Sequence, residues 1–342
     1  MLAHRVLNIR KSLTILTRIL NRNMCSTHHS SESGLFWNKD VPFFHKFDDG
    51  FITRGLRREE LETIRVGAVS GLGAYITAKE ADILWECADP VPGAHFYAGE
   101  VEGQLASAIV CYKVGPTIFA CGGAYSNPNL RAKNYWKRLH QWILNTNPAV
   151  DLLTDIQTQY LMKAFKSFGW KHVFNTLAWQ GHSISLDRFP DGVVQGSTIP
   201  PEKLVQYDAT RFIYPKSPVR KRLFQRWCDT DGFMVLVAIN AQQDITGFAV
   251  RRPATEDNFA IGPWYADNIG VAERLLQGLL YNVPQEVKFH VENWDPNADA
   301  QKLLKSYNFK NHDTYSFVKY GEKYEVYKPW IYGITSVDFC PC

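Results

Sequence analysis

The chain has 342 residues, more than one small hydrophobic core normally accommodates, so two domains are expected. Its formal net charge of +4 and its charged fraction of 21% are ordinary, and no long basic stripe predicts a nucleic-acid partner. No apolar run is long enough to predict a membrane span. The composition is that of a globular protein, and it leaves the oligomeric state open.

The N-terminal residues 1–31 differ in kind from the rest of the chain. They contain no acidic residue before Glu32, and Leu and Val recur in them at roughly helical spacing. Their basic residues are Arg5, Arg10, Lys11, Arg18 and Arg22. This composition is typical of a mitochondrial transit peptide and predicts a location in the matrix; a disordered basic tail is the alternative. Met24 offers an internal start that would give a cytosolic form.

The seven cysteines are scattered, except for Cys340 and Cys342 at the end of the chain. No cluster of His and Cys accompanies that pair, so we expect free thiols and no metal.

The first repeat of elements occupies residues 47–180. Tight turns between its central apolar runs predict an antiparallel meander. In chain order we expect a strand at 51–56, helices at 57–69 and 78–87, strands at 95–101, 104–114 and 117–125, a helix at 133–144, a strand at 151–156, a helix at 159–168 and a strand at 172–179.

The segment 181–201 is rich in Ser, Asp, Gly and Pro and predicts a linker, after which residues 202–342 repeat the order. The second repeat is expected to open at 204–207 and to continue with a helix at 219–228, strands at 233–239, 245–251 and 258–261, a helix at 270–281, a strand at 286–291, a helix at 298–307 and strands at 315–320 and 331–337. The two repeats predict a duplicated α+β fold, each half a mixed, mostly antiparallel sheet flanked by helices.

The segment 118–144 carries the clearest functional signal. An apolar strand ends at a turn marked by Asn127 and Pro128, and a basic helix entered at Arg131 follows. Unpaired backbone N–H groups and the positive end of the helix dipole meet at such a point, so it predicts a phosphate site.

Residues 47–342 resemble tandem GCN5-related N-acetyltransferase (GNAT) domains of the YitH/HolE type, which is expanded in nematodes. In the first half, 121–139 resembles the acyl-CoA motif of the family and 164–170 resembles its helix ending in Gly-Phe. The second half matches better, at Arg220 with 223–227, at 247–251, at 261–267 and at 331–336. The resemblance implies transfer of an acetyl or other acyl group from coenzyme A to an amine.

The resemblance also assigns the acyl-CoA site. A strand edge would pair with the pantetheine arm, and the turn after it would hold the pyrophosphate. The edge residues are Ala124, Tyr125, Ser126 and Asn127, and the turn residues are Arg131, Ala132, Lys133, Asn134, Tyr135 and Trp136. Arg131 matches the Arg/Gln of the family, whereas Ala132, Asn134 and Trp136 stand where it often has Gly or Ala.

The catalytic groups implied by the family are only partly present. Its usual tyrosine acid corresponds to Phe165 in the first half and to Leu304 in the second, and neither has a hydroxyl. Tyr160 and Tyr307 are candidate substitutes, with packing as the alternative for each. Asp155 and Glu100 are candidate bases.

In the second half, Trp264, Tyr265, Asp267 and Asn293 are candidates for an acceptor pocket. The alternative is that Trp264 and Trp294 pack between the domains and that Asn293 caps a turn.

We expect an N-acyltransferase that uses acetyl-CoA or another acyl-CoA, without a metal, on a small amine or amino acid. The alternatives are a catalytically weak or inactive acyl-CoA-binding protein that retains the fold, which the missing hydroxyls favour, and a scaffold whose pocket Trp136 fills.

Overall fold

The computed structural model describes residues 44–72, 76–88, 95–113, 118–146, 151–156, 159–184, 186–211, 218–254, 258–321 and 328–335. The expected transit peptide at 1–31 and the pair Cys340 and Cys342 lie outside these residues. The mitochondrial location therefore stays a prediction from the sequence.

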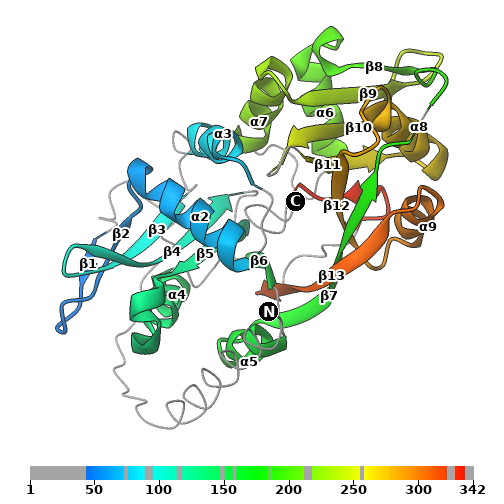
Figure 1. Cartoon of the computed structure of the whole chain (residues 1–342). Coiled ribbons are helices and arrows are strands. Elements are labelled where there is room, and N and C mark those ends of the chain that lie inside the picture. Colours follow the sequence, from blue (N-terminus) through cyan, green and yellow to red (C-terminus); the bar gives the residue numbers. More distant parts are fainter. Residues whose placement is uncertain are drawn as a thin grey trace. The chain divides into compact units, whose positions relative to one another are not determined.

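The N-terminal half follows the expected order of elements (Figure 1). Its elements are β1 (His45–Lys46), β2 (Ile52–Gly55), the short 3₁₀ helix η1 (Arg58–Glu60), α2 (Leu61–Leu72), α3 (Ala78–Ala88), β3 (His95–Val101), β4 (Gln104–Lys113), β5 (Ile118–Ser126), the 3₁₀ helix η2 (Pro128–Lys133), α4 (Tyr135–Thr146), β6 (Asp151–Ile156), α5 (Gln159–Ser167) and β7 (Lys171–His182).

The C-terminal half repeats that order but begins earlier than expected. The segment expected to be a linker contains a strand, and residues 204–207, expected to open the repeat, lie in a helix. The elements are β8 (Val193–Gln195), the 3₁₀ helix η3 (Gly196–Thr198), α6 (Pro201–Arg211), α7 (Pro218–Asp229), β9 (Met234–Ile239), β10 (Ile245–Pro253), β11 (Phe259–Ala266), α8 (Ile269–Leu280), β12 (Lys288–Trp294), α9 (Ala298–Ser306), β13 (Lys310–Tyr320) and β14 (Ile331–Gly333).

The described strands form one sheet. Its order is β1-β2-β3-β4-β5-β6-β13-β7-β12-β11-β10-β9-β8, and β14 pairs with β11. Neighbouring strands are antiparallel except β5 with β6 and β11 with β12, which are parallel. The expected α+β class, with a mixed and mostly antiparallel sheet in each half, is therefore confirmed.

Helices cover both faces of the sheet in the N-terminal half, because successive side chains of a strand point to opposite faces. Phe96 and Val110 lie in the core that contains α2 and α3. Their neighbours Tyr97, Ile109 and Cys111 lie in the core that contains α4 and α5.

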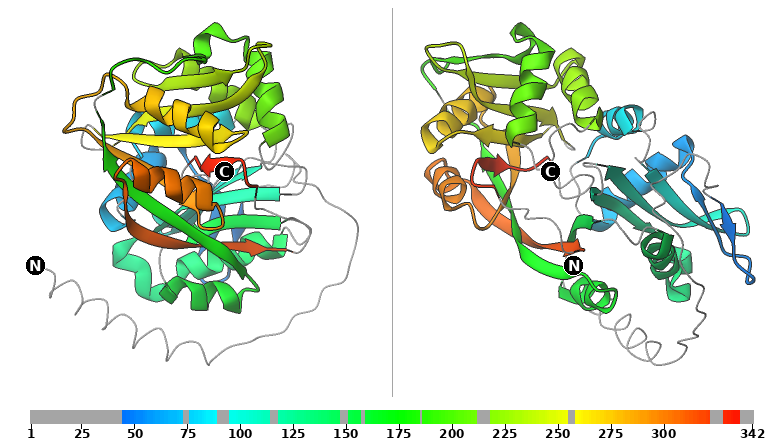
Figure 2. Two further views of the ribbon diagram at one scale, coloured as in Figure 1. Left: turned by 90° about the vertical axis from the view of Figure 1, so that its right-hand side faces the viewer. Right: turned by 180° about the vertical axis from the view of Figure 1, so that it is seen from behind.

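The two halves exchange their last long strands (Figure 2). Strand β13 of the C-terminal half lies between β6 and β7 of the N-terminal half. Strand β7 in turn lies between β13 and β12, both from the C-terminal half. Neither half can therefore complete its sheet without a strand from the other.

An aromatic cluster fills the exchanged region. Phe317 of β13 stacks on Phe174 of β7 with ring centroids 4.8 Å apart, and it lies 5.4 Å from Trp294 of β12. Phe317 and Trp294 are completely buried. These rings join three strands that come from both halves.

We expect Phe317→Ala to lower the free energy of unfolding by about 3–5 kcal/mol, because it removes a fully buried ring from this cluster. Since β13 completes both halves, the two halves should unfold in one transition. Its midpoint in denaturant should shift equally when unfolding is followed by fluorescence and by circular dichroism. Phe44→Ala is the control, because Phe44 is 56% exposed. A variant in which one half keeps its own unshifted transition would contradict the shared role of β13.

Candidate functional site

A bulge in β5 separates this strand from its parallel neighbour β6. The register between β4 and β5 shifts between Ala108 and Val110, so that Gly123 and Ala124 together lie opposite Ile109. Gly123 has φ of 56°, a conformation that glycine adopts without the steric cost borne by other residues. The extra residue bends β5 away from β6 beyond the bulge.

The ladder between β5 and β6 is correspondingly short. It runs from Ile118 opposite Asp151 to Ala120 opposite Leu153. Within the described residues, the rest of β5 has ladder partners only on the β4 side. The strand edge at 124–126 therefore presents backbone N–H and C=O groups to an added strand or an extended ligand.

The chain leaves this edge through a turn that Asn127 organises. Its backbone N–H donates to the carbonyl of Ala106 at 2.9 Å, and its side chain accepts from the N–H of Asn129 at 3.0 Å. Pro128 then begins η2, as expected of a residue without an N–H at a helix start.

The expected pyrophosphate turn is thus a turn of 3₁₀ helix. Asn134 follows it in the left-handed region, with φ of 57°, and α4 begins at Tyr135 instead of at residue 133 as expected. The side chain of Ala132 lies outside the described part of the chain. Tyr135 is buried and stacks on Phe51 with ring centroids 5.1 Å apart, so its side chain belongs to the core.

The cations at this turn have different surroundings. Arg131 is exposed, and its Nε donates to the carbonyl of Ser126 at the edge of β5 at 3.4 Å. Lys133 is also exposed. Arg138, by contrast, makes two hydrogen bonds to the carboxylate of Asp49, at 2.5 and 2.9 Å. Arg131 and Lys133 therefore carry the positive charge beside the edge.

The ring of Trp136 packs against the region where α4 meets α5. It stacks on His140 with centroids 4.9 Å apart and lies 5.6 Å from Phe165. Phe165, at the position where the family carries its acid, is itself 5% exposed. The structure thus brings together two residues that depart from the family pattern, and it places both in aromatic packing.

His140 is a buried titratable group that the sequence did not single out. It is 2% exposed, and its Nε2 accepts a hydrogen bond from Nε1 of Trp170 at 3.0 Å. Burial lowers the pKa of this histidine to about 4. The imidazole is therefore neutral at pH 7, and its only sequence signal is the spacing from Trp136 on one helical face.

Asp155 lies near the end of β6, two residues beyond the last pair of the ladder with β5. Its Oδ1 accepts a hydrogen bond from Oγ1 of Thr176 at 2.6 Å, which fixes the carboxylate. Tyr160 lies in α5, but its side chain is outside the described residues. Glu100, the other candidate base, is paired with Arg54, with Oε2 to Nε at 2.7 Å.

The four candidates for an acceptor pocket do not share one exposed surface. Trp264, Tyr265 and Asn293 are completely buried. Asn293 accepts a hydrogen bond from Nε1 of Trp179 at 2.7 Å. Asp267, by contrast, is exposed and accepts one from the hydroxyl of Tyr207 at 2.9 Å.

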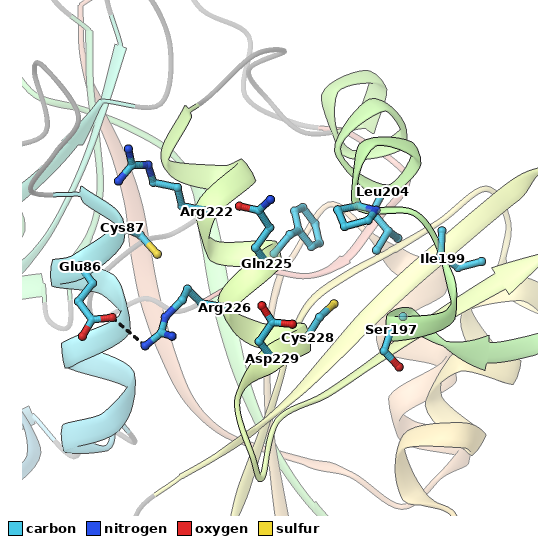
Figure 3. A pocket seen from close by; sticks show the side chains of 13 residues that line it. Glu86, Cys87, Ser197, Ile199, Leu204, Arg222, Gln225, Arg226, Cys228 and Asp229 are labelled. Carbon is cyan, nitrogen blue, oxygen red and sulfur yellow. Dashed lines mark hydrogen bonds and ion pairs between the residues drawn. The ribbon is translucent and has the colours of Figure 1, made fainter.

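A cavity of about 520 Å³ lies elsewhere, between α3 and the helices of the C-terminal half (Figure 3). Glu86 and Arg226 form an ion pair at 2.7 Å beside it. Burial raises the pKa of the lining thiols Cys87 and Cys228 to about 11, so both are protonated at neutral pH. None of the residues expected in a site lines this cavity.

In the described part of the chain, no helix is both long and apolar enough to cross a membrane. Nor does this part contain a group of three or more His, Cys, Asp or Glu residues placed to hold a metal ion.

The splayed parallel strands, the bulge and the helix after β5 define a GNAT fold, which occurs here twice. The family described as acetyltransferase (GNAT) domain matches residues 206–333, which lie in the C-terminal half. No curated protein matches the chain.

Solved structures of tandem size share this fold. A putative acetyltransferase from Pyrococcus horikoshii is 17% identical with a TM-score of 0.68, over 91% of this chain and 99% of that one. A GCN5-related N-acetyltransferase from Sphaerobacter thermophilus is 16% identical with a TM-score of 0.54, over 83% and 99%. A tandem GNAT protein from the clavulanic acid biosynthesis pathway is 12% identical with a TM-score of 0.54, over 80% and 99%.

We expect His140→Gln to reduce the loss of stability on acidification. The folded protein keeps this imidazole neutral until the pH nears 4, whereas the unfolded chain binds a proton near pH 6.5, so stability falls as the pH drops through this window. His140 should account for about 2–3 kcal/mol of the difference in unfolding free energy between pH 7 and pH 4.5. Glutamine retains an acceptor for Trp170.

Urea unfolding at the two pH values measures this difference. His172→Gln, a change at an exposed histidine, is the matched control and should keep the wild-type pH dependence. Burial also lowers the pKa of His290 to about 4, so part of the acid sensitivity remains in the His140 variant. If His140→Gln leaves the difference in unfolding free energy between pH 7 and pH 4.5 unchanged, His140 is not a source of the acid sensitivity.

Proposed function

We propose that the protein transfers an acyl group from acyl-CoA to a small amine or amino acid, and that its N-terminal half holds the acyl-CoA. The observation that carries this proposal is the bulged edge of β5 beside the exposed cations Arg131 and Lys133, within a GNAT fold. The acyl-CoA supplies an activated thioester and a thiolate leaving group. The finer assignment to the YitH/HolE type rests on the motifs of the second half.

The residues present fit such a ligand. The amide groups of a pantetheine arm would pair with the backbone at 124–126 as an added strand does. Arg131, Lys133 and the positive end of α4 would attract the phosphates. The absence of a small residue at position 136 matters less than the sequence implies, because the ring of Trp136 packs against His140 and Phe165.

Two side chains beside the open edge suit the proton transfers. Asp155, held by Thr176, is the candidate base for the acceptor ammonium. Tyr125 on the edge of β5 is the candidate acid, because burial raises the pKa of its hydroxyl against the opposing effect of Arg131, so the hydroxyl keeps its proton near neutral pH. Tyr125 would replace the hydroxyl absent from Phe165.

The alternative is a protein that binds acyl-CoA without transferring the acyl group, and it is raised by Phe165, which packs into the core in place of the acid of the family. Calorimetry with acetyl-CoA, followed by thiol release against a panel of amines, separates the two functions. Binding with no thiol release would identify the alternative.

We expect Arg131→Ala to weaken acetyl-CoA binding about 3- to 10-fold, because an exposed guanidinium contributes a charge-assisted contact that water partly screens. Isothermal titration measures this change. Arg188→Ala is the matched control, since the Arg188 side chain is 81% exposed and precedes β8 in the other half. Equal affinities in the two variants would place the phosphates elsewhere.

We expect Asp155→Asn to lower kcat about 10²- to 10⁴-fold and to remove the acidic limb of the pH profile, because an amide cannot accept the proton of the amine. The amide oxygen can still accept from Thr176, so the fold should persist. Asp244→Asn, an exposed change in the turn between β9 and β10, is the control. Retention of the acidic limb in the Asp155 variant would exclude this residue as the base.

A further inference from the structure

The C-terminal half contains the same bulge and the same splayed strands as the N-terminal half. The register between β10 and β11 shifts between Ala249 and Arg251, so that two residues of β11, the first of them Gly262, lie opposite one residue of β10. The parallel ladder between β11 and β12 ends at Ile261 opposite Val291. A second open edge would therefore be expected on β11, beyond its bulge.

That edge is covered by the chain itself. Strand β14 pairs with β11 directly after the bulge, with Trp264 opposite Gly333 and Tyr265 opposite Ile331. On its other side, the N–H of Ile334 donates to the carbonyl of Glu292 in β12 at 2.9 Å. The short strand β14, drawn in red in Figure 2, thus lies between the two splayed strands.

Buried side chains hold β14 in this position. Nδ2 of Asn297 donates to the carbonyl of Ile331 at 2.7 Å and to that of Pro329 at 3.2 Å. The guanidinium of Arg252 donates to the carbonyls of Gly262, at 2.7 Å, and of Thr335. Both Asn297 and Arg252 are 3% exposed, so these contacts are shielded from water.

The backbones of β11 and β14 are in direct contact. A methyl group in place of a hydrogen at Gly262 would overlap the carbonyl oxygen of Ile334. Ile331, Ile334 and Thr335 are each at most 3% exposed. A pantetheine arm could enter this slot only after β14 had left it.

We propose that β14 occupies in cis the slot of the C-terminal half that corresponds to the open edge of β5, so that each chain takes one acyl-CoA, in its N-terminal half. This inference rests on the proposed function for the location of that acyl-CoA. The C-terminal half is a GNAT domain that binds its own strand in place of a cofactor.

Hydrogen exchange of the full chain, with and without saturating acetyl-CoA, tests the proposal together with the calorimetric stoichiometry. We expect one acetyl-CoA per chain, added protection at 124–136, and β14 amides that are already protected and unchanged by the ligand. Two ligands per chain, or a change of exchange at 262–266 or 331–334, would overturn the inference. Exchange at 331–334 as fast as in the exposed turn at Glu102 would also overturn it.

These outcomes separate the inference from the proposed function. If acetyl-CoA does not bind at all while 331–334 stays protected, the proposed function fails and the closed slot stands. If one acetyl-CoA binds but protects 262–266 in place of 124–136, the inference fails and acyl-CoA binding stands.

The variant Asn297→Asp tests what holds β14. A carboxylate can still accept from the N–H of Ala300 and so cap α9, but it lacks the two N–H groups that reach Ile331 and Pro329. We expect exchange at 331–334 to rise about tenfold, as the loss of two hydrogen bonds implies. Asn268→Asp, the same change at the N-cap of α8, is the matched control and should leave the exchange at 331–334 unaltered. Equal exchange in both variants would contradict the role of Asn297.

Discussion

The pairing of β6 with β13 is the constraint on which the candidate site depends. The ladder with β13 runs from Leu152 to Ile156, nearly the whole length of β6, so β6 cannot follow β5 when the bulge at Gly123 bends β5 away. The two parallel strands therefore separate. Because β13 comes from the C-terminal half, the open edge in the N-terminal half requires the whole chain.

The two halves use one geometry in different ways. In each, a bulge ends a short parallel ladder and leaves a slot between two strands. In the C-terminal half that slot is closed by β14, which satisfies the backbone groups that a bulged strand leaves unpaired. In the N-terminal half the described residues supply no such strand, and the exposed side chain of Arg131 lies beside the edge. The duplication thus yields one half with an open strand edge and one half whose corresponding edge is covered by its own strand.

Some of the basic and aromatic side chains near the candidate site pack against the core, whereas others stay exposed beside the strand edge. Arg138 is bound to Asp49 and stacked over Phe51 at 4.5 Å, so it stabilises the fold. The ring of Trp136 likewise joins an aromatic cluster between α4 and α5. Arg131 remains exposed, at the point where an anion would meet the start of α4.

The sequence by itself determined most of the order of the elements, the repetition of that order and the position of the turn after β5, because apolar periodicity, turn residues and helix entries are local signals. Asn127 and Pro128 marked the turn correctly. Local signals did not reveal that 204–207 is helical or that a strand precedes it.

Only the tertiary structure decided the exchange of β7 and β13, the closure of one slot by β14, and the burial of Asn293 and His140. These features depend on pairing between segments far apart in the chain. Such pairing is selected by which strands bury their faces together, a property that no short stretch of sequence records.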